Sequence, residues 1–100
     1  LGSGLDTSVP TRAAASAVRN LAANHNAAQL SIAQAGAIAP LIRLLEHTDL
    51  GVQAQAAAAL GNLAGDSSEN HFDKQVMIAQ AGAVPPLVRL LEGETAEVKE

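Results

Sequence analysis

Cysteine, tryptophan and tyrosine are absent from this chain of 100 residues, and phenylalanine occurs once. Without cysteine the chain has neither a disulfide framework nor a thiolate metal site. Strands favour aromatic and β-branched residues, so their scarcity argues against a β-sheet core. The chain is nevertheless 48% hydrophobic, and much of that share is alanine, which has the highest helix propensity. The composition therefore predicts closely packed helices in one small domain.

Clustered positive charge and long apolar runs are missing as well. The formal net charge is -4, whereas nucleic-acid-binding domains usually carry clustered Lys and Arg. No apolar run approaches the roughly 18 residues that a membrane span requires. We therefore expect a protein that binds no nucleic acid, has no membrane span and works inside the cell, in the cytoplasm or the nucleus.

Catalytic motifs are equally scarce. The sequence contains no Ser/His/acid set, paired carboxylates, zinc motif or glycine-rich phosphate loop. His25 and His71 recur at equivalent positions, but one histidine per repeat supplies too few metal ligands, and capping or surface placement explains them better. The sequence predicts no enzyme, no catalytic or metal site and no cofactor.

An internal repeat is the strongest positive signal. The stretch AQAGAIAPLIRLLE at residues 33–46 returns 46 positions later as AQAGAVPPLVRLLE at residues 79–92. Asn20 and Asn62, in the stretches RNLA and GNLA, are 42 positions apart. The polar insertion at residues 66–69 accounts for the difference of four. A unit of 42 residues falls within the roughly 40–47 residues of helical HEAT and armadillo units.

Each unit accommodates three helices. Gly36 and Gly82 predict the end of the first helix, because a helix C-terminus often needs a left-handed residue. Prolines fall in the first turn of the second helix, where a missing N–H costs little. Asp49 is the expected N-cap of one third helix, and Thr7 or Ser8 of the other. The expected helices are, in chain order, 9–23 (third), 26–34 (first), 38–46 (second), 50–64 (third), 71–80 (first) and 84–92 (second).

The stretch AGAIAPLIRLLEHTDLGVQAQAAAALGNLAG, residues 35–65, resembles the armadillo repeat family. The similarity rests on a glycine turn followed by a proline-containing second helix, and on a third helix that ends in Asn-Leu-Ala; HEAT repeats lack both. It implies an all-α fold, an α-solenoid wound as a right-handed superhelix, and a non-enzymatic scaffold that binds proteins. The expected segments are a lead-in at 1–5, a third helix at 6–24, a complete repeat at 25–65, and a repeat at 66–100 whose third helix is truncated.

The resemblance also implies a binding groove, because third helices of this family line a concave surface that holds an extended peptide. In the family an asparagine near the end of each third helix bonds the peptide backbone, and it corresponds here to Asn20 and Asn62. Asparagine is a poor helix former, and its amide offers a donor and an acceptor, which suits a peptide backbone. The alternative is that each asparagine bonds a neighbouring carbonyl or caps its own helix.

The rest of the expected groove departs from the importin pattern. Importin-like repeats carry a tryptophan four residues before the asparagine, but those positions here are Ser16 and Ala58. Arg19 and Gln55 complete the expected site, with one positive charge and one amide. The groove should therefore be shallow, and a receptor for basic localisation signals is not expected.

The second helices carry Arg43 with Glu46 and Arg89 with Glu92, which we expect to form solvent-exposed pairs three positions apart.

The two ends of the chain suggest an alternative function, as an assembly segment of a longer solenoid. Apolar faces should be uncovered near both ends of the chain. If one copy docked on the end of another, residues 95–100 of one would compete with the incoming residues 7–12 of the next for the same surface. Association would be head to tail, giving a ring or filament, or two-fold, giving a homodimer. The residues concerned are Val9, Ala17, Val18 and Leu21 at one end, and Leu87, Leu90 and Leu91 at the other.

Overall fold

Six helices and no strand make up residues 7–23, 26–65 and 71–93, the part of the chain that the computed structural model describes. The all-helical class predicted from composition is confirmed, and every helix lies within two residues of its expected range. The lead-in, His25, the polar insertion, residues 95–100 and the side chain of His71 lie outside the described residues. The helices are α1 (Ser8–Ala22), α2 (Asn26–Gln34), α3 (Ile38–Leu44), α4 (Leu50–Ala64), α5 (His71–Gln80) and α6 (Val84–Leu91).

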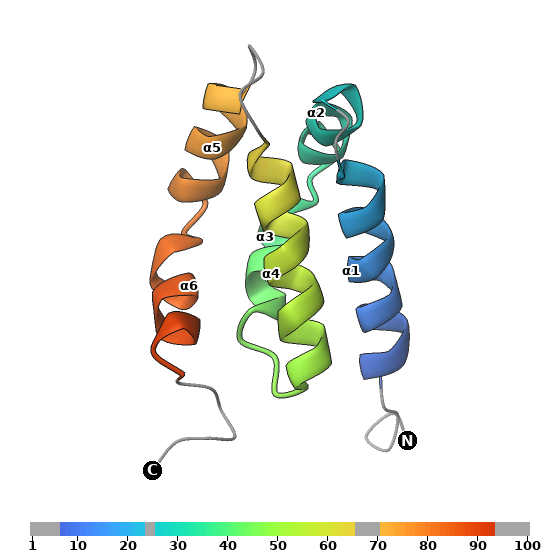
Figure 1. Ribbon diagram of the computed structural model, residues 1–100, viewed down its shortest axis with the longest axis vertical. Helices are drawn as coiled ribbons and strands as arrows, with labels where there is room; N and C mark the ends of the chain where they lie inside the picture. The colour runs from blue at the N-terminus through green and yellow to red at the C-terminus, as the bar shows by residue number, and fades with distance from the viewer. Residues whose placement is uncertain (1–6, 24–25, 66–70, 94–100) are drawn as a thin grey trace.

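The helices are arranged as successive repeats across the molecule (Figure 1). The two third helices, α1 and α4, run parallel and side by side, and α3 packs behind α4. Helices α5 and α6 lie on the flank opposite α1. Each described helix therefore packs mainly on its own repeat and the neighbouring one, as in a solenoid.

Glycine ends both first helices for a conformational reason. Gly36 and Gly82 have φ angles of 92° and 97°, a region that residues with a Cβ rarely adopt. The following Ala37 N donates to Ile32 O at 3.4 Å, which satisfies a carbonyl of the last turn of α2. A Cβ on either glycine would meet nothing within 4 Å, so the backbone angle, and not a lack of space, requires glycine.

Helix α4 forms the centre of the core. Its buried residues recur at spacings of three and four, as the sequence predicts, and α3 packs against them through Ile38 and Leu41. Several of the buried residues are alanines, which let the helix axes approach closely. The buried apolar residues of α4 are Val52, Ala56, Ala59, Leu60 and Leu63.

Thr7 and Asp49 hold the N-cap positions predicted for the third helices, but only Asp49 makes a side-chain capping bond. Asp49 Oδ1 accepts a hydrogen bond from Val52 N at 2.9 Å, so Asp49 caps α4. Thr7 holds the N-cap position of α1, but its side chain makes no capping hydrogen bond there. Ser8 is the first residue of the helix.

Replacing Asp49 with alanine should lower the free energy of unfolding by about 1 kcal/mol, because the amide of Val52 loses its acceptor. Urea unfolding followed by circular dichroism measures the change. Thr48→Ala, at the exposed neighbouring position, is the matched control and should shift stability little. Equal stability of the two variants would show that the cap contributes nothing.

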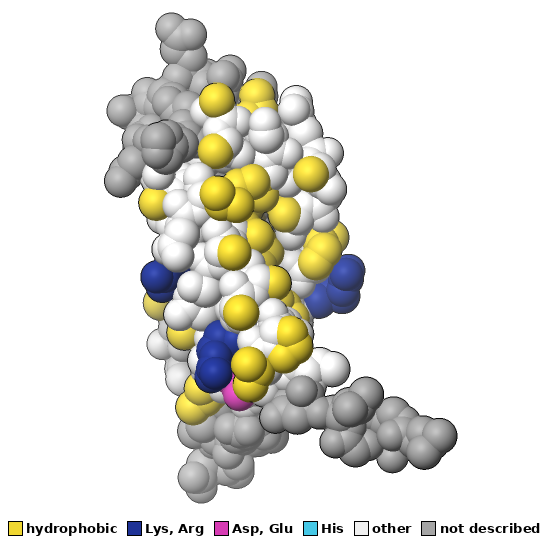
Figure 2. All heavy atoms as spheres, turned by 90° about the vertical axis from the view of Figure 1, so that its right-hand side faces the viewer, with side chains coloured by type: hydrophobic (Ala, Val, Ile, Leu, Met, Phe, Trp, Pro, Cys, Tyr) yellow, Lys and Arg dark blue, Asp and Glu magenta, His cyan; other side chains and the backbone are white. Residues whose placement is uncertain are grey.

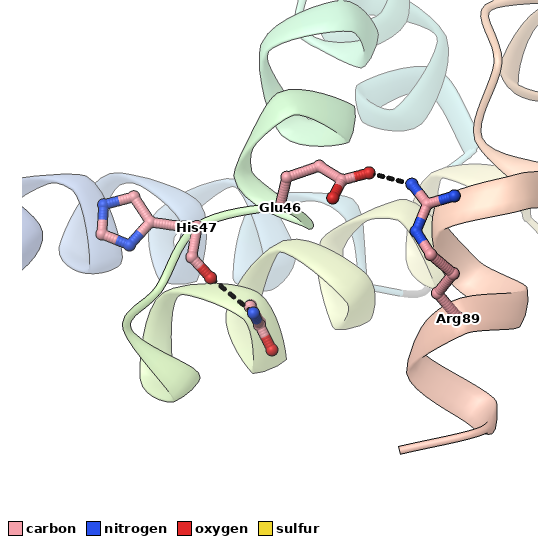
Figure 3. Close-up of polar contacts among 4 residues, drawn as sticks. Glu46, His47 and Arg89 are labelled. Carbon is pink, nitrogen blue, oxygen red and sulfur yellow. Dashed lines mark hydrogen bonds and ion pairs between the residues drawn. The ribbon is translucent and has the colours of Figure 1, made fainter. Parts of the chain in front are cut away.

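The expected pairs within each second helix are wrong. Arg89 of α6 instead forms an ion pair with Glu46, which follows α3 (Figure 3). The pair joins neighbouring repeats, because Glu46 follows the second helix of one repeat and Arg89 lies on the second helix of the next. Arg43 and Glu92 make no ion pair with any described residue. Both paired side chains are about half exposed, so this contact contributes little to stability.

A buried polar chain connects α5, α2 and α1. Lys74 is fully buried, and its Nζ donates to Gln29 Oε1. Gln29 Nε2 in turn donates to Ala22 O, in the last turn of α1, at 2.8 Å. One glutamine therefore satisfies a buried ammonium and a helix-terminal carbonyl together.

Candidate peptide-binding surface

The two third helices contact each other over most of the length of α4. Near its start, a Cβ on Gly51 would lie 2.9 Å from Arg12 Cδ of α1. Near its end, Asn62 Nδ2 donates to Arg19 O of α1 at 2.8 Å. These two contacts define which faces of α1 and α4 meet.

Five of the six predicted groove residues lie along this line of contact. On α4, Gln55, Ala58 and Asn62 follow Gly51 at spacings of four, three and four, so they share one face. On α1, Ser16 and Arg19 follow Arg12 at spacings of four and three. Asn20, the sixth, is exposed at the edge of this surface, whereas the other five are half-buried. We call the surface the α1–α4 seam, formed by Arg12, Ser16, Arg19, Asn20, Gln55, Ala58 and Asn62.

Asn62 of α4 uses only one N–H of its side-chain amide in a hydrogen bond within the fold. Arg19 is among the last four residues of α1, whose carbonyls have no intrahelical donor, and Asn62 satisfies one of them. The fold thus uses one N–H of Asn62, in a bond to a carbonyl of α1 43 positions away and not to a neighbouring carbonyl of its own helix. No donor among the described residues reaches its Oδ1. That oxygen and the second N–H have no partner among the described residues.

A second amide oxygen on the seam also lacks a donor. Gln55 Oε1 is buried and makes no hydrogen bond within the described part of the chain. An unpaired buried acceptor costs about 1–3 kcal/mol, so a donor that reached it would be favourable.

The charge of the seam comes from α1. Arg12 and Arg19 lie seven positions apart on one helix face, and neither forms an ion pair with a described residue. The carboxylate of Asp49, which caps α4, lies close to the Arg12 guanidinium, because Arg12 Nη1 and Asp49 Oδ1 would each lie 3.1 Å from a Cβ on Gly51. Sequence analysis missed Arg12 because the equivalent position of the next repeat is alanine. The seven-residue spacing from Arg19 is the signal that could have identified it.

Neither a metal site nor a membrane-spanning helix is found among the described residues. No group of three or more His, Asp and Glu side chains among them could hold a metal ion. No described helix is both long and apolar enough to cross a bilayer.

The geometry thus defines an α-solenoid of three-helix repeats with a polar seam between its third helices. A comparison with protein-family models matches the armadillo/β-catenin-like repeat at residues 25–65 and 73–100, together more than half of the chain. The chain belongs to the armadillo repeat family, a non-enzymatic scaffold fold that generally mediates protein–protein interaction. No curated protein and no solved structure gave a match in the corresponding searches.

Proposed function

We propose that the α1–α4 seam binds an extended, acidic peptide segment of a partner protein. The observation that carries the proposal is Asn62, whose carboxamide oxygen has no donor and lies beside Arg19 on a half-buried surface. An extended peptide presents main-chain N–H groups that can donate to this oxygen. The equivalent amide of Asn20 lies one repeat away; its Oδ1 accepts from Arg19 Nη2 at 3.5 Å, and its N–H groups can donate to a peptide carbonyl.

The spacing of the two asparagines suits an extended chain that crosses both third helices. Packed helices lie about 8–10 Å apart, and the inner side of a curved stack is shorter. Alternate residues of an extended peptide are about 6.6 Å apart. One asparagine per repeat can therefore meet every second peptide residue.

The side chains around the asparagines select the ligand. Arg19 and Arg12 favour carboxylates, which they can bind with paired hydrogen bonds. Basic peptides gain nothing here, since the chain has no tryptophan on which their aliphatic stems could stack. Ser16 and Ala58 are small, so the seam accommodates a peptide backbone without deep side-chain pockets.

Fluorescence anisotropy with labelled acidic peptides, and with basic peptides of matched length, tests the proposal. Acidic peptides should bind more tightly, and their affinity should fall with salt. Asn62→Ala should weaken binding by about 0.5–1.5 kcal/mol, roughly two- to tenfold, because one hydrogen bond is lost. Asn20→Ala should have an effect of similar size, and it removes no contact to α4.

The control for this experiment is Thr48→Ala, which lies outside the seam. Circular dichroism of each variant separates lost binding from lost structure, because Asn62 also bonds Arg19 O. Equal affinity for acidic and basic peptides, or unchanged binding in both asparagine variants, would contradict the proposal.

A further inference from the structure

Three polar groups of His47 take part in the turn between α3 and α4. Its backbone N–H donates to Leu44 O at 3.1 Å, and its carbonyl oxygen accepts a bond from the side-chain amide of Gln53. The ring nitrogen Nδ1 accepts a hydrogen bond from Asp49 N at 3.0 Å. A backbone amide can only donate, so Nδ1 carries no proton in this arrangement.

This ring nitrogen holds the residue that caps α4. Asp49 donates its backbone N–H to the ring of His47, and its carboxylate accepts from Val52 N at 2.9 Å. His47 is half-buried, so solvent reaches it without unfolding of the core. The first turn of α4 therefore depends on a ring nitrogen that can take up a proton.

The other charged groups near the turn are carboxylates and arginines. Glu46 precedes His47 and pairs with Arg89 of α6, and the imidazole points away from this pair (Figure 3). Arg43 of α3 is exposed and makes no ion pair with a described residue, and α4 carries no charged side chain. Carboxylates titrate about two pH units below histidine, and arginine stays charged. Between about pH 5 and 8, the charge that changes in this turn is therefore that of the histidine.

Helix α1 brings a further charge close to the turn. Arg12 Nη1 would lie 3.1 Å from a Cβ on Gly51, and Asp49 Oδ1 would lie at the same distance. The Asp49 carboxylate therefore offsets part of the positive charge at this end of the α1–α4 seam. Seen from the side of α1, the described part of the molecule exposes basic side chains and very little acidic surface (Figure 2). Asp49 thus links the turn that contains His47 to the seam.

We propose that His47 is a pH-sensitive switch, which exchanges its partner from the backbone amide of Asp49 to the carboxylate of the same residue. When neutral, the ring accepts from Asp49 N, as in the structure. When Nδ1 takes up a proton from solvent, two donors would face each other, which is unfavourable. The charged ring is attracted instead to the Asp49 carboxylate, which then leaves Val52 N. The cap of α4 therefore loosens as the pH falls.

The switch regulates the proposed peptide site, and this consequence rests on the proposed function. A protonated His47 pairs with the carboxylate that offsets Arg12, so the seam gains positive charge as the pH falls. Acidic peptides should then bind several-fold more tightly at about pH 5.5 than at about pH 8. Fluorescence anisotropy at the two pH values measures the difference, and His47→Asn should bind equally at both.

Nuclear magnetic resonance of the full chain from about pH 8 to about pH 5 tests the switch itself. The backbone amide signals of Asp49 and Val52 should shift together with the ring signals of His47, with one common midpoint. Protection of the Val52 amide against hydrogen exchange should fall several-fold over the same range, because its acceptor is lost. The amide of Leu60, a buried residue later in the same helix, is the internal control and should keep its protection.

Two substitutions separate the acceptor from the charge. His47→Asn places an oxygen the same number of bonds from the backbone as Nδ1, and this oxygen takes up no proton in the same range. Its Asp49 and Val52 amides should keep their high-pH signals throughout. His47→Gln is the matched control, because its oxygen is one bond farther out and the bond to Asp49 N should be missing at every pH. His25 and His71 remain in both variants, so any titration of theirs is the same.

Amide signals of Asp49 and Val52 that do not follow the titration of His47 would overturn the switch, as would a His47→Asn variant that keeps the pH response. Equal peptide affinity of the unmodified chain at the two pH values would overturn the coupling to the seam. Absence of binding at either pH would contradict the proposed function, and the amide signals would still decide the switch. Failure of one proposal is thereby distinguishable from failure of the other.

Discussion

Gln29→Ala is expected to lower the free energy of unfolding by about 2–4 kcal/mol, because hydrogen bonds to charged groups contribute about 1.5–3 kcal/mol and a second bond is lost with it. Gln29 is 3% exposed and is the partner that the described residues offer to the buried Lys74 ammonium. Its amide nitrogen also satisfies Ala22 O at 2.8 Å. The substitution leaves a buried charge and a buried carbonyl unpaired at once.

Two comparison variants isolate this effect in urea unfolding experiments. Gln34→Ala alters an exposed glutamine at the end of the same helix and should change stability by less than about 0.5 kcal/mol. Lys74→Met keeps an unbranched side chain but removes the buried charge, so it should cost less than Gln29→Ala. If Gln29→Ala and Gln34→Ala were equally stable, the buried polar chain would have no energetic role.

Leu63→Ala is expected to destabilise the fold by about 2–5 kcal/mol, the range for leucine truncation in a packed core. Leu63 is 0% exposed on α4, at the centre of the core. The loss combines the transfer free energy of the removed methyl groups with the cavity that they leave. For a domain of this size such a change is a large fraction of total stability.

The repeat supplies a control at the equivalent position. Leu21 of α1 aligns with Leu63 but is 61% exposed. Leu21→Ala should therefore change stability by less than about 0.5 kcal/mol, measured at micromolar concentration. Similar losses in both variants would mean that Leu21 is buried in solution, and would contradict its exposure on α1.

Most of the fold was predictable because helix ends and helix faces depend on residues that are close together in the sequence. The glycine turns at Gly36 and Gly82 and the cap at Asp49 depend on a few neighbouring residues, and the structure has them as expected. The buried stripe of α4 follows from spacing alone. The repeat of 42 residues, lengthened by its polar insertion, then placed the helices within two residues of their observed bounds.

Contacts between repeats were not predictable in the same way. Glu46 pairs with Arg89 across 43 positions, and Lys74 reaches Gln29 across 45. Such partners depend on how far one repeat is rotated against the next, which spacing within a helix does not specify. The exposure of Val84 and Val88 in place of Leu87 and Leu90 has the same origin.

The candidate site was predictable from the sequence in part: most of its residues were, and the contacts between its two helices were not. The repeat identified Asn62, and the structure adds its bond to Arg19 O, which only the packing of α1 against α4 could reveal. The same packing brings Arg12 beside Gly51 and so adds a second positive charge to the seam. These contacts are the basis of the proposal that the seam prefers an acidic peptide.

The most direct test of this account is nuclear magnetic resonance of the isotope-labelled chain during titration with an acidic peptide. The side-chain amide signals of Asn20, Asn62 and Gln55 should shift, together with backbone signals of α1 and α4 that face the seam. Signals of α6 should stay in place at concentrations where the chain is monomeric. Shifts confined to α3 and α6, or none with millimolar peptide, would contradict peptide binding at the α1–α4 seam.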